Sequence, residues 1–139
     1  MSDRVFVDTN ILVYAHDISA GNKHQKARDI VSDLWVSGLG VISTQVLQEF
    51  YNAVTRKVPK PLPLQEARRK VSDFSKWGVV VIGVDDVLDA IDIQARYGFS
   101  FWDSLIISAA ITADARVLIT EDLTDGQEVR GVLVSNPLL

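Results

Sequence analysis

Apolar residues recur along this chain with two alternating periods, that of a buried strand and that of an amphipathic helix. Short runs rich in β-branched residues predict five strands, and these lie at Arg4–Val7, Val41–Ile42, Val79–Ile82, Val117–Thr120 and Val132–Val134. Apolar residues three and four positions apart predict helices, and these lie at Asn10–His16, Lys23–Val36, from Ser43 or Thr44 to about Arg56, Leu64–Lys76, Asp85–Tyr97 and from Ser100 or Phe101 to Ala113.

The regular alternation of these elements predicts the fold class. A repeated strand–helix order favours an α/β fold in which a central parallel sheet carries helices on both faces. Neither an internal repeat nor a low-complexity tract interrupts the order. Pro59, Pro61 and Pro63 predict an extended connector, with too little sequence on either side to make it a domain boundary. We therefore expect one domain over residues 1–139.

Four acidic residues stand where such a fold would bring them together. Asp8 directly follows the first strand and Asp122 follows the fourth by two residues, while Glu49 and Asp103 lie in helices. Ligands of parallel α/β sheets bind outside the carboxyl ends of the strands, and we expect all four acids to face that edge. A cation there would offset charges that are costly beside apolar sequence. Carboxylates suit Mg²⁺ or Mn²⁺, and such an ion activates water for hydrolysis of a phosphodiester.

Each acid also has a simpler explanation when it is taken alone. Asp8 is well placed to be the N-cap of the following helix, and Asp103 to complete a capping box with Ser100. Glu49 falls at the margin of the apolar stripe of its helix, where a solvated side chain is ordinary. Asp122 lies in an acidic turn, which is common loop chemistry. The joint placement of the four, more than any one of them, favours a metal site.

The charge balance is compatible with that chemistry. The 139-residue chain has 14 basic and 18 acidic residues, giving a net charge of −4, which argues against a broadly basic nucleic-acid surface. Without the four acids the remainder is neutral, so the acidic total does not exclude a nucleic-acid enzyme with carboxylates in its active site. The chain has no cysteine, which excludes disulfides and thiolate metal sites.

The apolar runs are too short for a membrane protein. None approaches the roughly 20 residues that span a bilayer, and the first residues lead into a strand without an apolar signal segment. We expect a cytoplasmic protein with no membrane partner.

At the four acids the chain resembles the PIN-domain ribonucleases, and within them the VapC toxins of bacterial and archaeal toxin–antitoxin pairs. The resemblance covers essentially the whole chain and rests on Val7-Asp8-Thr9-Asn10, Gln48-Glu49-Phe50, Phe101-Trp102-Asp103-Ser104-Leu105-Ile106, Leu118-Ile119-Thr120-Glu121-Asp122-Leu123 and the closing Gly131-Val132-Leu133-Val134-Ser135-Asn136-Pro137. It implies a three-layer α/β/α PIN fold with a parallel sheet. It also implies a Mg²⁺- or Mn²⁺-dependent endoribonuclease, an antitoxin that blocks the site, and a homodimer.

The resemblance also assigns roles to particular residues. It places Asp8, Glu49, Asp103 and Asp122 in the catalytic, metal-binding site, and it implies that three polar neighbours orient these acids or bound water; the neighbours are Thr9, Asn10 and Thr120. Glu121 and Asp125 flank the fourth acid, and Asp122 is chosen because it matches the Thr/Ser-x-Asp pattern of the family.

Other functions remain alternatives to a toxin nuclease. A PIN nuclease that acts without an antitoxin would share every motif, and a non-catalytic α/β protein-binding module would share the fold. A phosphoacceptor receiver would need an acidic pair after the first strand, and Asp8 has no adjacent acid. The basic residues are concentrated in one region, at Arg56, Lys57, Lys60, Arg68, Arg69 and Lys70. They suit an RNA backbone, although we favour a solvated helix face and connector.

Overall fold

The computed structural model describes residues 2–139 and contains one six-stranded sheet. The strands are β1 (Val5–Val7), β2 (Gly40–Ser43), β3 (Gly78–Val80), β4 (Val117–Ile119), β5 (Glu128–Val129) and β6 (Val132–Ser135). Their order across the sheet is β3-β2-β1-β4-β6-β5, and every neighbouring pair is parallel except β5 with β6. The predicted parallel α/β sheet is therefore confirmed, with one antiparallel edge strand added.

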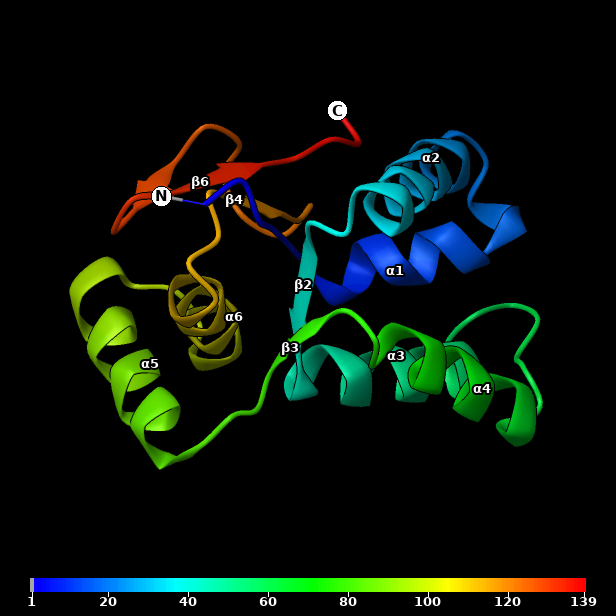
Figure 1. Cartoon of the computed structure of the whole chain (residues 1–139), viewed down its shortest axis with the longest axis horizontal. Coiled ribbons are helices and arrows are strands. Elements are labelled where there is room, and N and C mark those ends of the chain that lie inside the picture. Colours follow the sequence, from blue (N-terminus) through cyan, green and yellow to red (C-terminus); the bar gives the residue numbers. More distant parts are fainter. Residues whose placement is uncertain (1) are drawn as a thin grey trace.

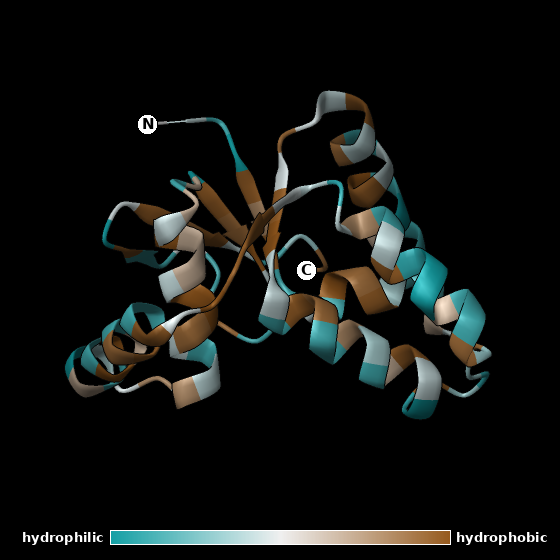
Figure 2. Ribbon diagram, turned by 60° about the horizontal axis from the view of Figure 1, so that its bottom comes forward, coloured by the Kyte–Doolittle hydropathy of each residue, from teal (hydrophilic) through white to brown (hydrophobic). Residues whose placement is uncertain are grey.

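Helices cover the sheet in two groups, which gives the predicted three layers (Figure 1). The helices are α1 (Thr9–His16), η1 (Ile18–Ala20, a 3₁₀ turn), α2 (Asn22–Ser37), α3 (Thr44–Arg56), α4 (Leu64–Phe74), α5 (Val84–Tyr97) and α6 (Phe101–Thr112). Helix α1 packs on α2 and α3, and α3 packs on α4, whereas α5 packs on α6. Figure 2 shows the apolar strands between these two groups. No helix within residues 2–139 is long and apolar enough to cross a membrane.

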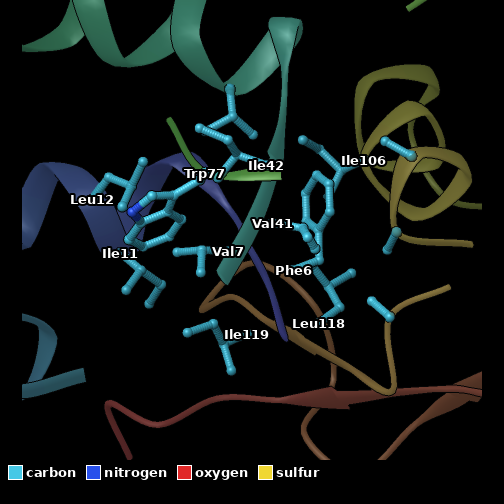
Figure 3. Packing of buried hydrophobic residues seen from close by; sticks show 14 of the residues in the cluster. Phe6, Val7, Ile11, Leu12, Val41, Ile42, Trp77, Ile106, Leu118 and Ile119 are labelled. Carbon is cyan, nitrogen blue, oxygen red and sulfur yellow. The ribbon is translucent and has the colours of Figure 1, made fainter. Parts of the chain in front are cut away.

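The alternation of side chains along β1 connects the core to the edge of the sheet. Phe6 and Val7 are fully buried and point to opposite faces: Phe6 lies beside Ile106 of α6, and Val7 lies on the side of α1 (Figure 3). Successive strand residues alternate faces, and Asp8 keeps extended backbone angles. Asp8 therefore turns to the same side as Phe6, toward α6.

Three features of the fold differ from the predictions by more than one residue at an element's end. The second half of the strand predicted at Val79–Ile82 leaves the sheet, because the Ile82 amide donates to Thr44 Oγ1 at 3.1 Å instead of to a neighbouring strand. Helix α4 ends at Phe74 rather than Lys76. Strand β5 was not predicted: it has two residues and joins β6 through a turn with positive φ at Arg130 and Gly131.

Candidate acidic active site

Asp8 lies where β1 ends and α1 begins, and two hydrogen bonds hold its carboxylate. Its side chain is only 5% exposed. Oδ1 accepts the Thr9 amide at 2.7 Å, so Asp8 is the N-cap of α1. Oδ2 accepts the Thr120 hydroxyl at 2.8 Å. Because β1 pairs with β4 and Val7 stands opposite Ile119, the next residues along, Asp8 and Thr120, are neighbours across the strand ends.

The surroundings of Asp8 disfavour its charge. Burial raises the pKa of Asp8 to about 7, and repulsion from Asp122 and Glu49 adds to the increase, against the hydrogen bonds from Thr120 and Thr9. A buried carboxylate with a raised pKa at the end of a strand is typical of a functional site. This environment would hold an ionised Asp8 most readily with a cation beside it.

Glu49 reaches the same region from α3. The Thr9 hydroxyl donates to Glu49 Oε1 at 2.8 Å. Gln45 Nε2, one helical turn earlier, lies 3.4 Å from Glu49 Oε2 and 3.3 Å from the carbonyl oxygen of Trp102. Gln45 is 5% exposed and ties α3 to the start of α6. The sequence interpretation missed Gln45, although its spacing of four residues from Glu49 is the spacing of side chains that meet on a helix.

Asp103 lies in the first turn of α6. The Ser100 hydroxyl accepts the Asp103 amide at 3.1 Å, so Ser100 is the N-cap of α6. This is one half of the predicted capping box, and the described residues show no return bond from the Ser100 amide to the Asp103 carboxylate. The pKa of Asp103 is raised, chiefly by burial and also by repulsion from Asp122 and Glu49, while a hydrogen bond with Ser100 opposes the increase. Asp103 can therefore belong to the capped first turn of α6 and also lie among the four acids.

Asp122 is the acid of its turn that lies with the other three. Asn10 Nδ2 donates to Asp122 Oδ2 at 3.0 Å, and the Asp122 amide donates to Thr120 Oγ1 at 3.1 Å. Because Thr120 also donates to Asp8, it joins the first and fourth acids. The three predicted polar neighbours, Thr9, Asn10 and Thr120, thus each form a hydrogen bond with at least one of the acids.

The two flanking acids are held elsewhere. Glu121 accepts hydrogen bonds from the Tyr14 hydroxyl and from Lys23 Nζ, the second at 3.0 Å. Asp125 Oδ1 accepts the Asn136 amide at 2.8 Å. The geometry therefore selects Asp122 from the three acids of this turn. No sequence spacing pointed to the Tyr14–Glu121–Lys23 group, because α1 and α2 approach this loop only in the folded chain.

Two of the four acids, Glu49 and Asp122, line a pocket that opens to solvent. It has a volume of about 440 Å³, and its lining includes Thr9, Asn10, Glu49 and Asp122. No group of three or more acidic or histidine side chains within residues 2–139 is already arranged to hold a metal ion. The donor set nevertheless fits a hard cation, since it consists of carboxylate and hydroxyl oxygens.

Comparisons with known proteins agree with this architecture. The sequence profile of the PIN domain matches residues 5–124. Among solved structures, a toxin–antitoxin complex from Klebsiella pneumoniae is 19% identical with a TM-score of 0.67, over 96% of this chain and 97% of that one. The sarcin–ricin-loop-cleaving toxin VapC20 of Mycobacterium tuberculosis is 18% identical with a TM-score of 0.62, over 82% and 86%.

DNA-bound VapBC from Salmonella typhimurium is also similar, with 18% identity and a TM-score of 0.67 over 98% of this chain and 99% of that one. At such identities the likeness shows a shared fold. No curated protein matches the sequence.

Proposed function

Since the chain belongs to the PIN domain family, we propose that it is a metal-dependent endoribonuclease and the toxin of a toxin–antitoxin pair. The observation that carries the nuclease is the buried Asp8, which lies within electrostatic reach of Glu49 and Asp122 at the edge of the sheet. The toxin assignment draws its support from the fold shared with toxin–antitoxin structures and from the sequence resemblance to VapC toxins.

The proposed metal is Mg²⁺ or Mn²⁺, with Asp8 and Asp103 as its main ligands. Glu49 and Asp122 would complete the site directly or through water. When bound, the ion lowers the pKa of a water molecule and stabilises the negative charge that develops on the scissile phosphate. Without it, the four carboxylates would repel the RNA, which is why we expect activity to depend strictly on metal.

The polar neighbours would act by orienting the acids. Thr120 holds one oxygen of Asp8 and leaves the carboxylate fixed at the end of β1. Thr9 and Asn10 hold Glu49 and Asp122 in the same way. Such supporting hydrogen bonds fix the direction of a ligand and tune its affinity for metal.

EDTA and the Asp103→Asn substitution are each expected to remove cleavage of RNA. The substitution should lower the rate at least about 100-fold, because loss of an outer partner of a metal site already costs about 10- to 100-fold. The measurement is the rate of cleavage of a mixed RNA pool by purified protein with MnCl₂ or MgCl₂. Asp92→Asn is the matched control, because it removes one charge from an exposed position on α5.

Cleavage that persists in EDTA or in Asp103→Asn would contradict a metal nuclease. If no RNA in the pool is cut while the protein binds a partner protein, the non-catalytic binding module becomes the better explanation. Cleavage without any neighbouring antitoxin would instead indicate a nuclease that acts alone.

The proposed antitoxin is expected to place an Arg or Lys side chain toward the four acids. A cation at this point would pair with the carboxylates and compete with metal. The measurement is inhibition of cleavage by the product of a short reading frame adjacent to this gene, compared with variants in which each Arg or Lys is changed to Ala. A structure of the inhibited complex with no cationic side chain at the acids would contradict the mechanism.

A homodimer is the assembly that we propose for the toxin. Helix α5 exposes Val84, Leu88 and Ile91 by 76%, 55% and 47%, and these positions share one face of the helix. An exposed apolar stripe of this kind favours protein association. A monomeric mass in sedimentation at micromolar concentration would rule the homodimer out.

A further inference from the structure

The pocket beside the acids presents negative charge to a polyanionic substrate. Glu49, Asp122 and Asp17 all line it, and the chain as a whole carries −4. Metal at the acids would neutralise the scissile phosphate. The phosphates on either side of it need positive side chains of the protein, which supply most of the sequence-independent affinity for a nucleic acid.

Lys57 supplies such a charge. Of the residues 2–139, it is the only Lys or Arg that lines this pocket. It follows the last residue of α3 and is exposed. Glu49 lies eight residues earlier on the same helix, about 12 Å along its axis at a rise of 1.5 Å per residue. The backbones of the two residues are thus two helical turns apart, which places Lys57 beside the acids rather than among them and suits a phosphate that flanks the scissile one.

The Lys57 ammonium is available for a ligand. Ion pairs in the described part of the chain join Lys23 to Glu121, Arg116 to Asp3 and Arg130 to Asp89, and none involves Lys57. Lys23 also lies close to the acidic turn, but its ammonium donates to Glu121 and lies over the Tyr14 ring, whose centre is 5.1 Å from Nζ. Lys57 therefore differs from Lys23 in having no ion-pair partner among residues 2–139.

The backbone that carries Lys57 is well held. The Lys57 amide donates to the Ala53 carbonyl at 2.8 Å, and the Leu62 amide donates to the Val54 carbonyl at 2.9 Å. Val54 is buried in the core, so the end of α3 and the start of the proline connector are fixed relative to Glu49. A held backbone leaves only the lysine side chain to be ordered when a phosphate binds.

The groove continues beyond Lys57. A second pocket of about 390 Å³ shares Asp17 and Val58 with the first and is lined by Lys60. The prolines of the connector form much of its wall. The two pockets thus adjoin at Val58, which Lys57 and Lys60 flank, while Asp17 and Glu66 are the acids of the second pocket.

We propose that Lys57 binds a backbone phosphate of the RNA next to the scissile phosphate, and that the strand runs from the acids over Val58 toward Lys60. This inference rests on the proposed nuclease function. An ammonium recognises phosphate without reading the base, so Lys57 sets the register of the strand and contributes to affinity for any single-stranded RNA. Lys57 is thus a substrate-binding residue, and the acids carry the chemistry.

Two measurements test the role of Lys57. The first is binding of a fluorescein-labelled single-stranded RNA of random sequence to protein with all four acids intact. It is followed by anisotropy with CaCl₂, whose cation also takes oxygen ligands, and a gel confirms that the RNA stays uncut. The second is KM and kcat for cleavage in the wild-type background. Lys57→Ala is expected to raise both Kd and KM about tenfold, as loss of one charge-assisted contact implies, and to leave kcat within about twofold. The dependence of log K on log salt should fall by about 0.7, the value for one phosphate of a single strand.

Matched variants separate a contact from a general charge effect. Lys57→Arg keeps the charge and should stay within about threefold of wild type in Kd. Arg69→Ala removes the same charge from an exposed position on α4 and should change Kd by less than about twofold. Equal effects of Lys57→Ala and Arg69→Ala would overturn the inference, as would a loss of kcat with KM unchanged.

The binding and cleavage measurements distinguish a failure of the Lys57 contact from a failure of the proposed nuclease function. If wild-type protein cleaves RNA but Lys57→Ala binds and cleaves normally, only the role of Lys57 fails. If wild-type protein cleaves no RNA while binding still depends on Lys57, the nuclease assignment fails and the phosphate contact stands. A Lys57→Ala protein that loses affinity for the antitoxin but not for RNA would assign this groove to the protein partner and overturn the inference.

Discussion

Asp8→Asn is expected to abolish metal-dependent cleavage, with a loss of at least about 1,000-fold, while the protein stays folded. The loss is the largest predicted for a single acid because Asp8 is the most buried of the four and is one of the two main metal ligands that we propose. Asparagine is nearly isosteric, and its Oδ1 can still accept the Thr9 amide that caps α1. Single-turnover cleavage rates measure the loss of activity, and circular dichroism of the same samples measures whether the protein stays folded.

The control for this substitution is Asp92→Asn, which removes one charge away from the acids. Asp8→Asn protein that cleaves at more than about a tenth of the wild-type rate would show that Asp8 is dispensable, since an outer partner alone is worth about 10-fold or more. An unfolded Asp8→Asn protein would show that the N-cap and the hydrogen bond with Thr120, rather than the chemistry, require the carboxylate.

In metal-free buffer, the free energy of unfolding is expected to fall as pH rises from about 4 to about 7. The unfolded chain releases the Asp8 proton near pH 3.8, while the folded protein keeps it until about pH 7. The folded state therefore binds more protons across this interval, and stability declines with pH until both states are ionised. The full effect is roughly 4 kcal/mol, because each unit of pKa difference corresponds to about 1.4 kcal/mol.

Urea denaturation with EDTA at a series of pH values measures this decline. Asp8→Asn should flatten most of it, because an amide does not titrate, and should therefore be more stable than wild type at pH 7.5 and similar to it at pH 4. The raised pKa of Asp103 acts in the same direction and should leave a smaller residual slope. Parallel pH profiles for the two proteins would mean that the pKa of Asp8 is not raised by burial in the folded protein.

Added Mn²⁺ should reverse the decline for wild-type protein above pH 7 and have little effect on Asp8→Asn. The cation offsets the repulsion among the acids and binds the ionised carboxylates in the folded state alone, which stabilises that state by mass action. The same titrations with Ca²⁺-free, EDTA-treated protein provide the reference.

Much of the fold was predictable because strand and helix periods are local properties. Residues within a few positions of each other decide whether apolar side chains gather on one face of a helix or alternate along a strand. The predictions failed where a contact from elsewhere intervened. Thr44 takes the Ile82 amide out of the sheet, and β5 forms only because β6 is there to pair with its two residues.

The acidic site was predictable in part. In the sequence, Asp8 follows a predicted strand and Asp103 lies at the start of a predicted helix, so both could be placed at helix N-termini. The structure confirms this, since Asp8 is the N-cap of α1 and Asp103 lies in the capped first turn of α6. The sequence did not indicate that Gln45 and the Tyr14–Glu121–Lys23 group lie at the acidic site. Their contacts depend on which helix packs beside which loop, and this packing is set by residues far apart along the chain.

Short-range patterns in the sequence were enough to predict the alternation of strands and helices and the acids that follow apolar strands. The pairing of β1 with β4, which brings Thr120 to Asp8, could be seen only in the folded chain. It also decided that Asp122, rather than Glu121 or Asp125, lies with the other acids, and that Lys57 lines their pocket. These choices depend on strand order and side-chain direction, which long-range packing sets.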